Sequence, residues 1–151
     1  MKKQVHFFAQ YYAEQVDPAS NWAVISISDP TMRKEVKLNP NWRYKLELDF
    51  HDIDTEFKGF TLFNTDMAKQ IIDYVKDMIS KDIDVIVVHC WAGQSRSKAV
   101  AKFISDYFGY LTTYPIKWDE PYNKHVYEVL QATYNDGSLK RLYESLETKN
   151  K

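Results

Sequence analysis

The chain has 151 residues, a length that fits one domain, residues 1–151, with a hydrophobic core of its own. Its 20 basic residues nearly balance 21 acidic ones, and the formal net charge of −1 argues against nucleic-acid binding as its main activity. A single cysteine excludes an internal disulfide and any multi-cysteine metal site, and the four histidines lack ligand spacing, so we expect no metal and no cofactor.

No apolar run approaches the length of a membrane-spanning helix, and the first residues do not have the pattern of a signal peptide. We therefore expect a cytoplasmic protein with no membrane partner. A cysteine that works as a thiolate would also require such a reducing compartment.

The first third of the chain predicts three strands. Residues 5–8 are typical of a short edge strand, residues 9–16 of a short helix, and residues 22–28 of a strand that ends before Asp29-Pro30. Residues 30–41 contain prolines and charged residues and have no helical or strand periodicity, which predicts a loop. Residues 44–50 alternate apolar and polar side chains, which indicates a half-exposed strand.

The acidic loop 51–59 precedes a predicted helix over residues 66–80, which Asn64 or Thr65 would cap. Residues 83–88 are continuous and rich in β-branched side chains, as in a strand buried on both faces. A helix over 98–108 would end at Gly109, and residues 111–121 predict a surface connection. Two further helices are expected, over 122–134 and 138–146, separated by a turn at Asn135-Asp136-Gly137. This order predicts an α/β fold with a central, mostly parallel sheet of four or five strands flanked by helices.

The stretch that follows the buried strand has the features of an anion-binding site with a nucleophile. Cys90 lies where a central strand ends, which is the sheet edge where α/β proteins bind ligands. Gly93 allows a tight turn, and Ser95 can cap the next helix, whose N-terminus favours negative charge. Arg96 adds a planar cation suited to two phosphate oxygens.

These residues carry a family resemblance. His89-Cys90, five residues and then Arg96-Ser97, with Ala92-Gly93 inside the loop, resemble the signature of cysteine-dependent protein tyrosine phosphatases, most closely the dual-specificity branch and its compact bacterial and phage relatives. The resemblance covers roughly residues 46–109 and implies a protein-tyrosine-phosphatase-like fold.

The resemblance also implies roles for the residues of the loop. Cys90 would form a phosphocysteine intermediate, Ser97 would stabilise the thiolate as it leaves, and His89 would shape the loop. Phosphate oxygens would be held by Arg96 and by the backbone N–H groups of Trp91, Ala92, Gly93, Gln94, Ser95 and Arg96.

The general acid must come from another segment, and three carboxylates of the acidic region compete. Asp52 continues the phase of the packed residues Leu48 and Phe50 and is our first choice, Asp54 lies farther along the loop, and Asp49 is expected to face water. Each of them is by default an ordinary solvated carboxylate.

The expected function is hydrolysis of phosphotyrosine, with phosphoserine and phosphothreonine as further candidates, so the partner would be a phosphorylated protein or a small phosphoester. Two alternatives stay open: a catalytically silent phosphate-binding module of the same fold, and a rhodanese-like sulfur transferase. Residues 122–125 start a helix for which an ordinary capped surface helix is the favoured interpretation, and the alternative is that it packs on the back of the site or contributes to its rim.

Overall fold

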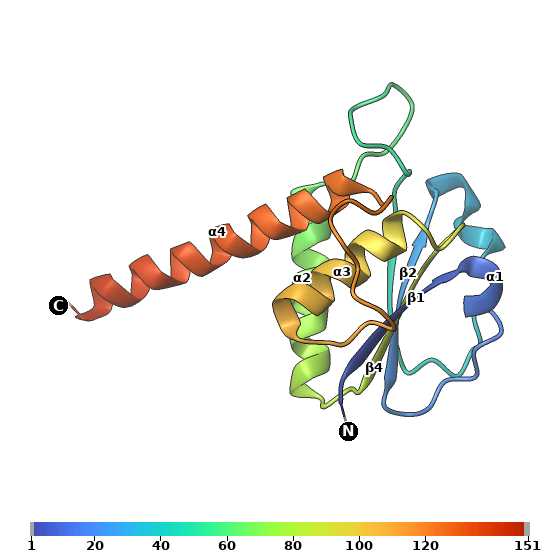
Figure 1. The fold of residues 1–151 in the computed structure, drawn as a ribbon, viewed down its shortest axis with the longest axis horizontal. Helices are drawn as coiled ribbons and strands as arrows, with labels where there is room; N and C mark the ends of the chain where they lie inside the picture. The colour runs from blue at the N-terminus through green and yellow to red at the C-terminus, as the bar shows by residue number, and fades with distance from the viewer. Residues whose placement is uncertain (1, 150–151) are drawn as a thin grey trace.

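The computed structural model describes residues 2–149, and its centre is a four-stranded sheet (Figure 1). The strands run in the spatial order β1-β4-β2-β3, and all three neighbouring pairs are parallel. Their bounds are β1 Gln4–Ala9, β2 Trp22–Ser28, β3 Tyr44–Asp49 and β4 Val85–Cys90. The α/β class and the parallel sheet expected from the sequence are confirmed.

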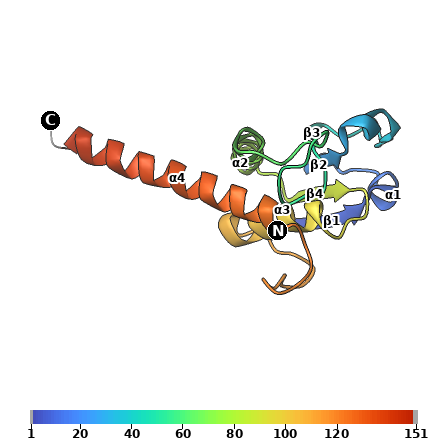
Figure 2. The same cartoon turned by 90° about the horizontal axis from the view of Figure 1, so that it is seen from above.

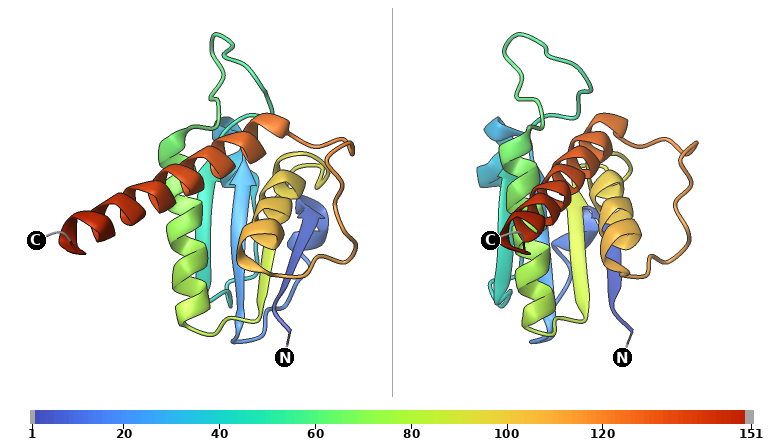
Figure 3. Two further views of the ribbon diagram at one scale, coloured as in Figure 1. Left: turned by 60° about the vertical axis from the view of Figure 1, so that its left-hand side comes forward. Right: turned by 90° about the vertical axis from the view of Figure 1, so that its left-hand side faces the viewer.

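Helices cover one face of the sheet, as Figures 2 and 3 show. The helical segments are α1 Gln10–Ala13, the 3₁₀ helix η1 Pro30–Glu35, α2 Thr65–Ser80, α3 Arg96–Phe108 and α4 Lys124–Lys149. The larger apolar cluster lies between the sheet and α2, α3 and α4, whereas a smaller one around Trp42 fills the opposite face. The burial of β4 on both faces explains its continuous run of β-branched residues.

Because the strands are parallel, their carboxyl ends meet at one edge. In the ladder, Ala9 of β1 pairs with Cys90 of β4, and Ser28 of β2 pairs with Asp49 of β3. The segments that follow the four strands therefore come together, although they are far apart in the sequence. This edge is where the site forms.

Local signals set several helix ends. Asn64 caps α2, because its side chain accepts a hydrogen bond from the N–H of Met67 at 3.0 Å. Gly109 ends α3 in the left-handed conformation, with a φ of 74°. Residues 30–41 are not wholly a loop as expected, because Pro30 sits at the start of η1, where its fixed φ suits a helical turn.

The carboxyl-terminal region differs most from the prediction. Residues 124–149 form one continuous helix, α4, rather than two helices with a turn at Asn135-Asp136-Gly137. The φ of Gly137 is not positive, so the turn that this sequence favours does not form. A glycine inside a helix costs only about 1 kcal/mol, which the surrounding helix can absorb. The prediction of a break was therefore wrong.

Candidate active site

Cys90 is the last residue of β4, and its side chain is almost completely buried, with 1% of the residue exposed. Its Sγ accepts hydrogen bonds from the backbone N–H groups of Gly93, at 3.3 Å, and of Ser97, at 3.5 Å. The Ser97 hydroxyl lies 3.1 Å from the same sulfur. These donors surround the sulfur at the start of α3, and they favour a negative charge on it.

Gly93 gives the loop its shape. Its φ is 70°, and a Cβ at this position would lie 2.2 Å from the backbone nitrogen of Ala9 and 2.4 Å from the carbonyl carbon of Phe8. The loop therefore packs directly on the backbone at the end of β1, and any side chain at position 93 would push it away.

Backbone hydrogen bonds hold the loop from both sides. The N–H of Gln10 donates to the carbonyl of Trp91 at 3.2 Å, and the N–H of Asn123 donates to the carbonyl of Ser95 at 3.3 Å. Among the described residues, no acceptor contacts the N–H of Ala92, Gln94 or Ser95. The loop is thus fixed through its carbonyls while these donors stay available, as in other anion cradles.

Arg96 begins α3 and is 5% exposed. One terminal nitrogen, Nη1, donates to Oδ1 of Asp29 and to the carbonyl of Phe50, each at 2.7 Å. The buried Nε has no hydrogen-bond partner, and within residues 2–149 none contacts Nη2. The guanidinium is therefore anchored at one corner, while its Nε–Nη2 edge can take two oxygens of an anion.

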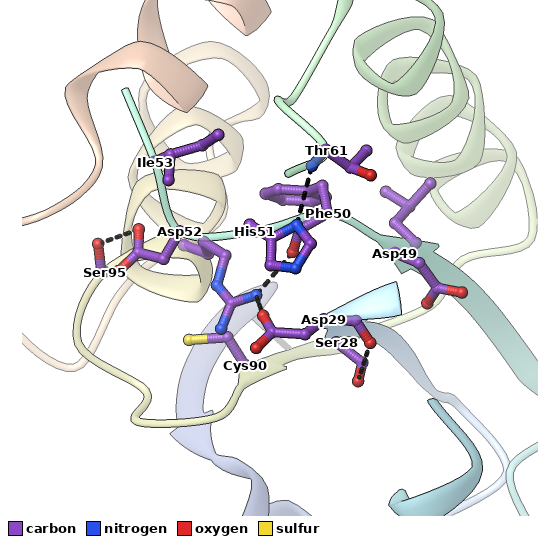
Figure 4. Close-up of polar contacts among 12 residues, drawn as sticks. Ser28, Asp29, Asp49, Phe50, His51, Asp52, Ile53, Thr61, Cys90 and Ser95 are labelled. Atoms are coloured by element: carbon purple, nitrogen blue, oxygen red, sulfur yellow. Dashed lines mark hydrogen bonds and ion pairs between the residues drawn. The ribbon is translucent and has the colours of Figure 1, made fainter. Parts of the chain in front are cut away.

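Asp52, the favoured general acid, lies at the rim of this site. Its Oδ1 accepts a hydrogen bond from Oγ of Ser95 and another from Nδ2 of Asn123, both at 2.8 Å. Figure 4 shows its side chain turned toward Ser95. Ser95 is the N-cap residue of α3, as expected, but its hydroxyl donates to Asp52 and makes no cap hydrogen bond.

The two competing carboxylates are placed differently. Asp54 is exposed and shares the lining of a cavity of about 470 Å³ with Asp52. Asp49 forms an ion pair with Arg33 at 2.7 Å, and in Figure 4 it is turned away from Cys90. The expectation that Asp49 faces water misses this ion pair, although part of the side chain is exposed.

His89 is completely buried beside Cys90. Its Nε2 lies 2.6 Å from Oγ of Ser26 on the neighbouring strand. Burial, helped by the positive charges of Arg33 and Arg96, lowers the pKa of His89 to about 4. The ring is therefore neutral near pH 7, so it places no positive charge beside Cys90.

The cavity beside Asp52 combines polar and apolar walls. Its lining residues are Asp52, Ile53, Asp54, Thr55, Phe57, Ser95, Tyr122, Asn123 and Lys124. The ammonium of Lys124 lies 3.5 Å from the centre of the Tyr122 ring. On the other side of the loop, Trp91 is 64% exposed at the mouth of a smaller cavity that Gln10 and Asp29 also line.

The sequence did not identify Asp29 or Asn123 as site residues. Asp29 was interpreted only as the end of a strand, and its role follows from the register that places the end of β2 beside β4. Asn123 caps α4, since its Oδ1 accepts from the N–H of Val126 at 3.0 Å, while its Nδ2 holds Asp52. The start of α4 thus contributes to the rim, which is the less favoured of the two interpretations of residues 122–125. The Asp-Pro and Asn-Lys-His sequences carry no signal for these contacts.

Across residues 2–149, no group of three or more His, Cys, Asp and Glu side chains is arranged to hold a metal ion. No helix in this part of the chain is both long and apolar enough to cross a membrane.

Comparison with protein-family models and with curated proteins finds no match. Among solved structures, the chain is similar to a human tyrosine phosphatase-like serine/threonine/tyrosine-interacting protein, with a TM-score of 0.53 and 20% sequence identity. The similarity covers 79% of this chain and 80% of that chain. At such an identity it concerns the fold alone. The chain thus has the α/β fold of a tyrosine phosphatase-like protein, as the signature residues led us to expect.

Proposed function

We propose that the chain is a cysteine-dependent phosphatase of the reducing cytoplasm that hydrolyses phosphate monoesters, with phosphotyrosine as the main substrate and phosphoserine or phosphothreonine as further ones. Within the tyrosine phosphatase superfamily we assign it to the compact dual-specificity-like branch of bacteria and phages, on the whole signature from His89 to Ser97. The observation that carries the proposal is the anchored Arg96, whose Nε lacks a partner beside a buried sulfur that accepts several hydrogen bonds.

In the first step, the Cys90 thiolate attacks phosphorus, an S–P bond forms and the bond from phosphorus to the ester oxygen breaks. Asp52 gives its proton to that oxygen, so the alcohol or phenol leaves neutral. The Nε–Nη2 edge of Arg96 and the loop N–H groups bind the three remaining oxygens, and they accelerate the step because they bind the transition state more strongly than the substrate.

In the second step, water attacks the phosphocysteine and Asp52 takes its proton, after which the S–P bond breaks and inorganic phosphate is released. The Ser97 hydroxyl, 3.1 Å from Sγ, stabilises the departing thiolate. The chain itself supplies the nucleophile, the donors and the acid, so the proposal requires no metal.

The cavity beside Asp52 supports the choice of substrate class. A leaving group protonated by Asp52 would lie there, where Phe57 and Tyr122 offer aromatic surface to a phenol ring. The loop has no lysine between Cys90 and Arg96, which favours a singly phosphorylated group over a highly charged polyphosphate.

The test is release of nitrophenolate from nitrophenyl phosphate in the presence of a chelator, by the wild type and by Cys90→Ser. We expect turnover by the wild type and its loss in the variant. Binding of phosphotyrosine peptide without turnover would instead identify a silent phosphate-binding module, a possibility consistent with the phosphatase-like, interacting protein that shares the fold. Transfer of sulfur from thiosulfate to cyanide would identify a rhodanese-like enzyme.

A further inference from the structure

We propose that Arg33 is a positioning residue for the nucleophile, which acts on Cys90 through Ser26 and His89. The inference rests on the proposed function, and it adds a residue from η1 that touches neither the loop nor a substrate in the cradle. It is carried by a continuous set of hydrogen bonds from the guanidinium to the residue that precedes Cys90.

Arg33 joins the ends of two neighbouring strands, β2 and β3. Its Nη2 donates to the carbonyls of Ser26, at 2.8 Å, and Leu48, at 3.0 Å, while Nε donates to Asp49 at 2.7 Å. Glu47 lies 3.2 Å from Nη1. With several partners and only 20% of its side chain exposed, the guanidinium is held in one place.

Arg33 fixes the direction of the hydrogen bonds that run through Ser26 to His89. Nη1 of Arg33 donates to Oγ of Ser26 at 2.6 Å, and arginine can only donate. Ser26 and His89 are paired residues of β2 and β4, and Oγ lies 2.6 Å from Nε2. Among the described residues, no other acceptor contacts this hydroxyl, so its proton goes to Nε2. The imidazole must then carry its proton on Nδ1.

The orientation of the His89 ring proton then acts on Cys90. Nδ1 of His89 is buried without a hydrogen-bond partner of ordinary geometry, and the backbone of Cys90 is its polar neighbour. The ring is neutral, so its N–H dipole, which the Ser26 hydroxyl orients, is what reaches the Cys90 backbone. Arg33 sets that orientation because it occupies the other side of the hydroxyl.

The remaining charges around His89 and Cys90 do not supply the same orientation. Arg96 is anchored by Asp29, and Asp49 and Glu47 pair with Arg33 itself. Asp52 is held at the rim by Ser95 and Asn123. Arg33 is thus the cation that contacts the Ser26 hydroxyl directly.

The experiment measures the rate of alkylation of Cys90 by iodoacetamide as a function of pH. Because the chain has one cysteine, the reaction reports on that sulfur alone, and it requires no turnover. For Ser26→Ala and Arg33→Met we expect the midpoint of the profile to move up by about one pH unit, the size of the effect of one lost hydrogen bond to a charged group. The double variant should shift no more than either single variant, since both break one path.

Lys34→Met is the matched control, because Lys34 is an exposed neighbour of Arg33 in η1 and its loss changes the net charge equally. We expect the wild-type midpoint. Unchanged midpoints in both Ser26→Ala and Arg33→Met, in proteins with native circular dichroism, would overturn the proposal even if their melting temperatures fall. An equal shift in Lys34→Met would overturn it too, since loss of net charge would then explain the result.

If Arg33→Met does not fold, Ser26→Ala decides, together with the nitrogen NMR shifts of His89. The wild type should show the neutral ring with its proton on Nδ1, and a proton on Nε2 would contradict the proposal. A protein that hydrolyses phosphate esters but shows no midpoint shift refutes the role of Arg33 alone. A shift in a protein without turnover refutes the proposed function instead.

Discussion

Two regions of the molecule differ in how far their large side chains are buried and partnered. At the carboxyl edge of the sheet, Arg96 is buried and anchored, and the polar groups around it have defined partners. In the outer part of α4, residues 138–147, which we call the α4 arm, large apolar side chains are exposed, and the arm projects beyond the sheet (Figure 1). The exposed apolar residues of the arm are Leu139, Leu142, Tyr143 and Leu146. The two regions therefore differ in whether their side chains are buried with defined partners or exposed.

The largest expected difference between the two regions concerns their arginines. Arg96→Ala should lower kcat/KM for nitrophenyl phosphate by about 10³-fold or more, because it removes two donors to the transition state. Arg96→Lys should recover little, since an ammonium cannot offer the paired Nε–Nη2 edge. Arg141→Ala in the exposed arm is the control and should leave kcat/KM unchanged. Equal losses in Arg96→Ala and Arg141→Ala would break the distinction between the regions.

The next largest effects are expected from the two carboxylates beside the loop, Asp52 and Asp54. Asp52→Ala should lower kcat/KM, which reports formation of the phosphoenzyme, by roughly 10²–10³-fold for an alkyl phosphate, whose leaving oxygen needs a proton, and much less for nitrophenyl phosphate. Asp54→Ala should change kcat/KM little for either substrate. Should Asp54→Ala give the dependence on leaving group and Asp52→Ala not, the assignment of the acid would be wrong.

The buried His89 gives the site a pH dependence that the arm lacks. Its folded-state pKa of about 4 is below the unfolded value, so the unfolded chain binds the proton first as the pH falls. Because of His89, the free energy of unfolding should fall by about 3 kcal/mol as the pH is lowered from 6.5 to 4. Above pH 6.5 the full stability is present. Urea unfolding of the wild type and of His89→Gln measures this. The same slope in both proteins would exclude His89 as its source.

The smallest effect is expected in the α4 arm itself. Leu142→Ser should change the free energy of unfolding by less than about 0.5 kcal/mol, because Leu142 is already 55% exposed. Ile104→Ala in α3 should cost about 2–5 kcal/mol, because that side chain is fully buried. Chemical denaturation of the two variants compares them. A loss above 2 kcal/mol for Leu142→Ser would mean that the arm is packed in solution.

The sequence predicted the parts of the fold that local patterns determine. The strand before Cys90, the glycine that ends α3 and the cap of α2 follow from burial, backbone freedom and side-chain hydrogen bonding within a few residues. The continuity of α4 could not be predicted in this way, because Asn135-Asp136-Gly137 is compatible with either a turn or a helix.

The same distinction holds at the site. The loop from Cys90 to Arg96 is contiguous in the sequence, so both residues could be named from it. Asp29 and Asn123 could not, because their contacts with Arg96 and Asp52 depend on strand register and on where α4 begins. Asp52 was preferred from the phase of its strand, and its hydrogen bonds with Ser95 and Asn123 strengthen that preference without testing the role.

The central claim is that phosphate is transferred to Cys90, and the most direct measurement is acid-quench trapping of that intermediate. In Asp52→Ala with nitrophenyl phosphate, the first step needs no acid while the second lacks its base, so the phosphoenzyme should accumulate. Mass spectrometry of the quenched protein should place one phosphate on Cys90. Rapid turnover with an unmodified Cys90, or phosphate on another residue, would contradict the account.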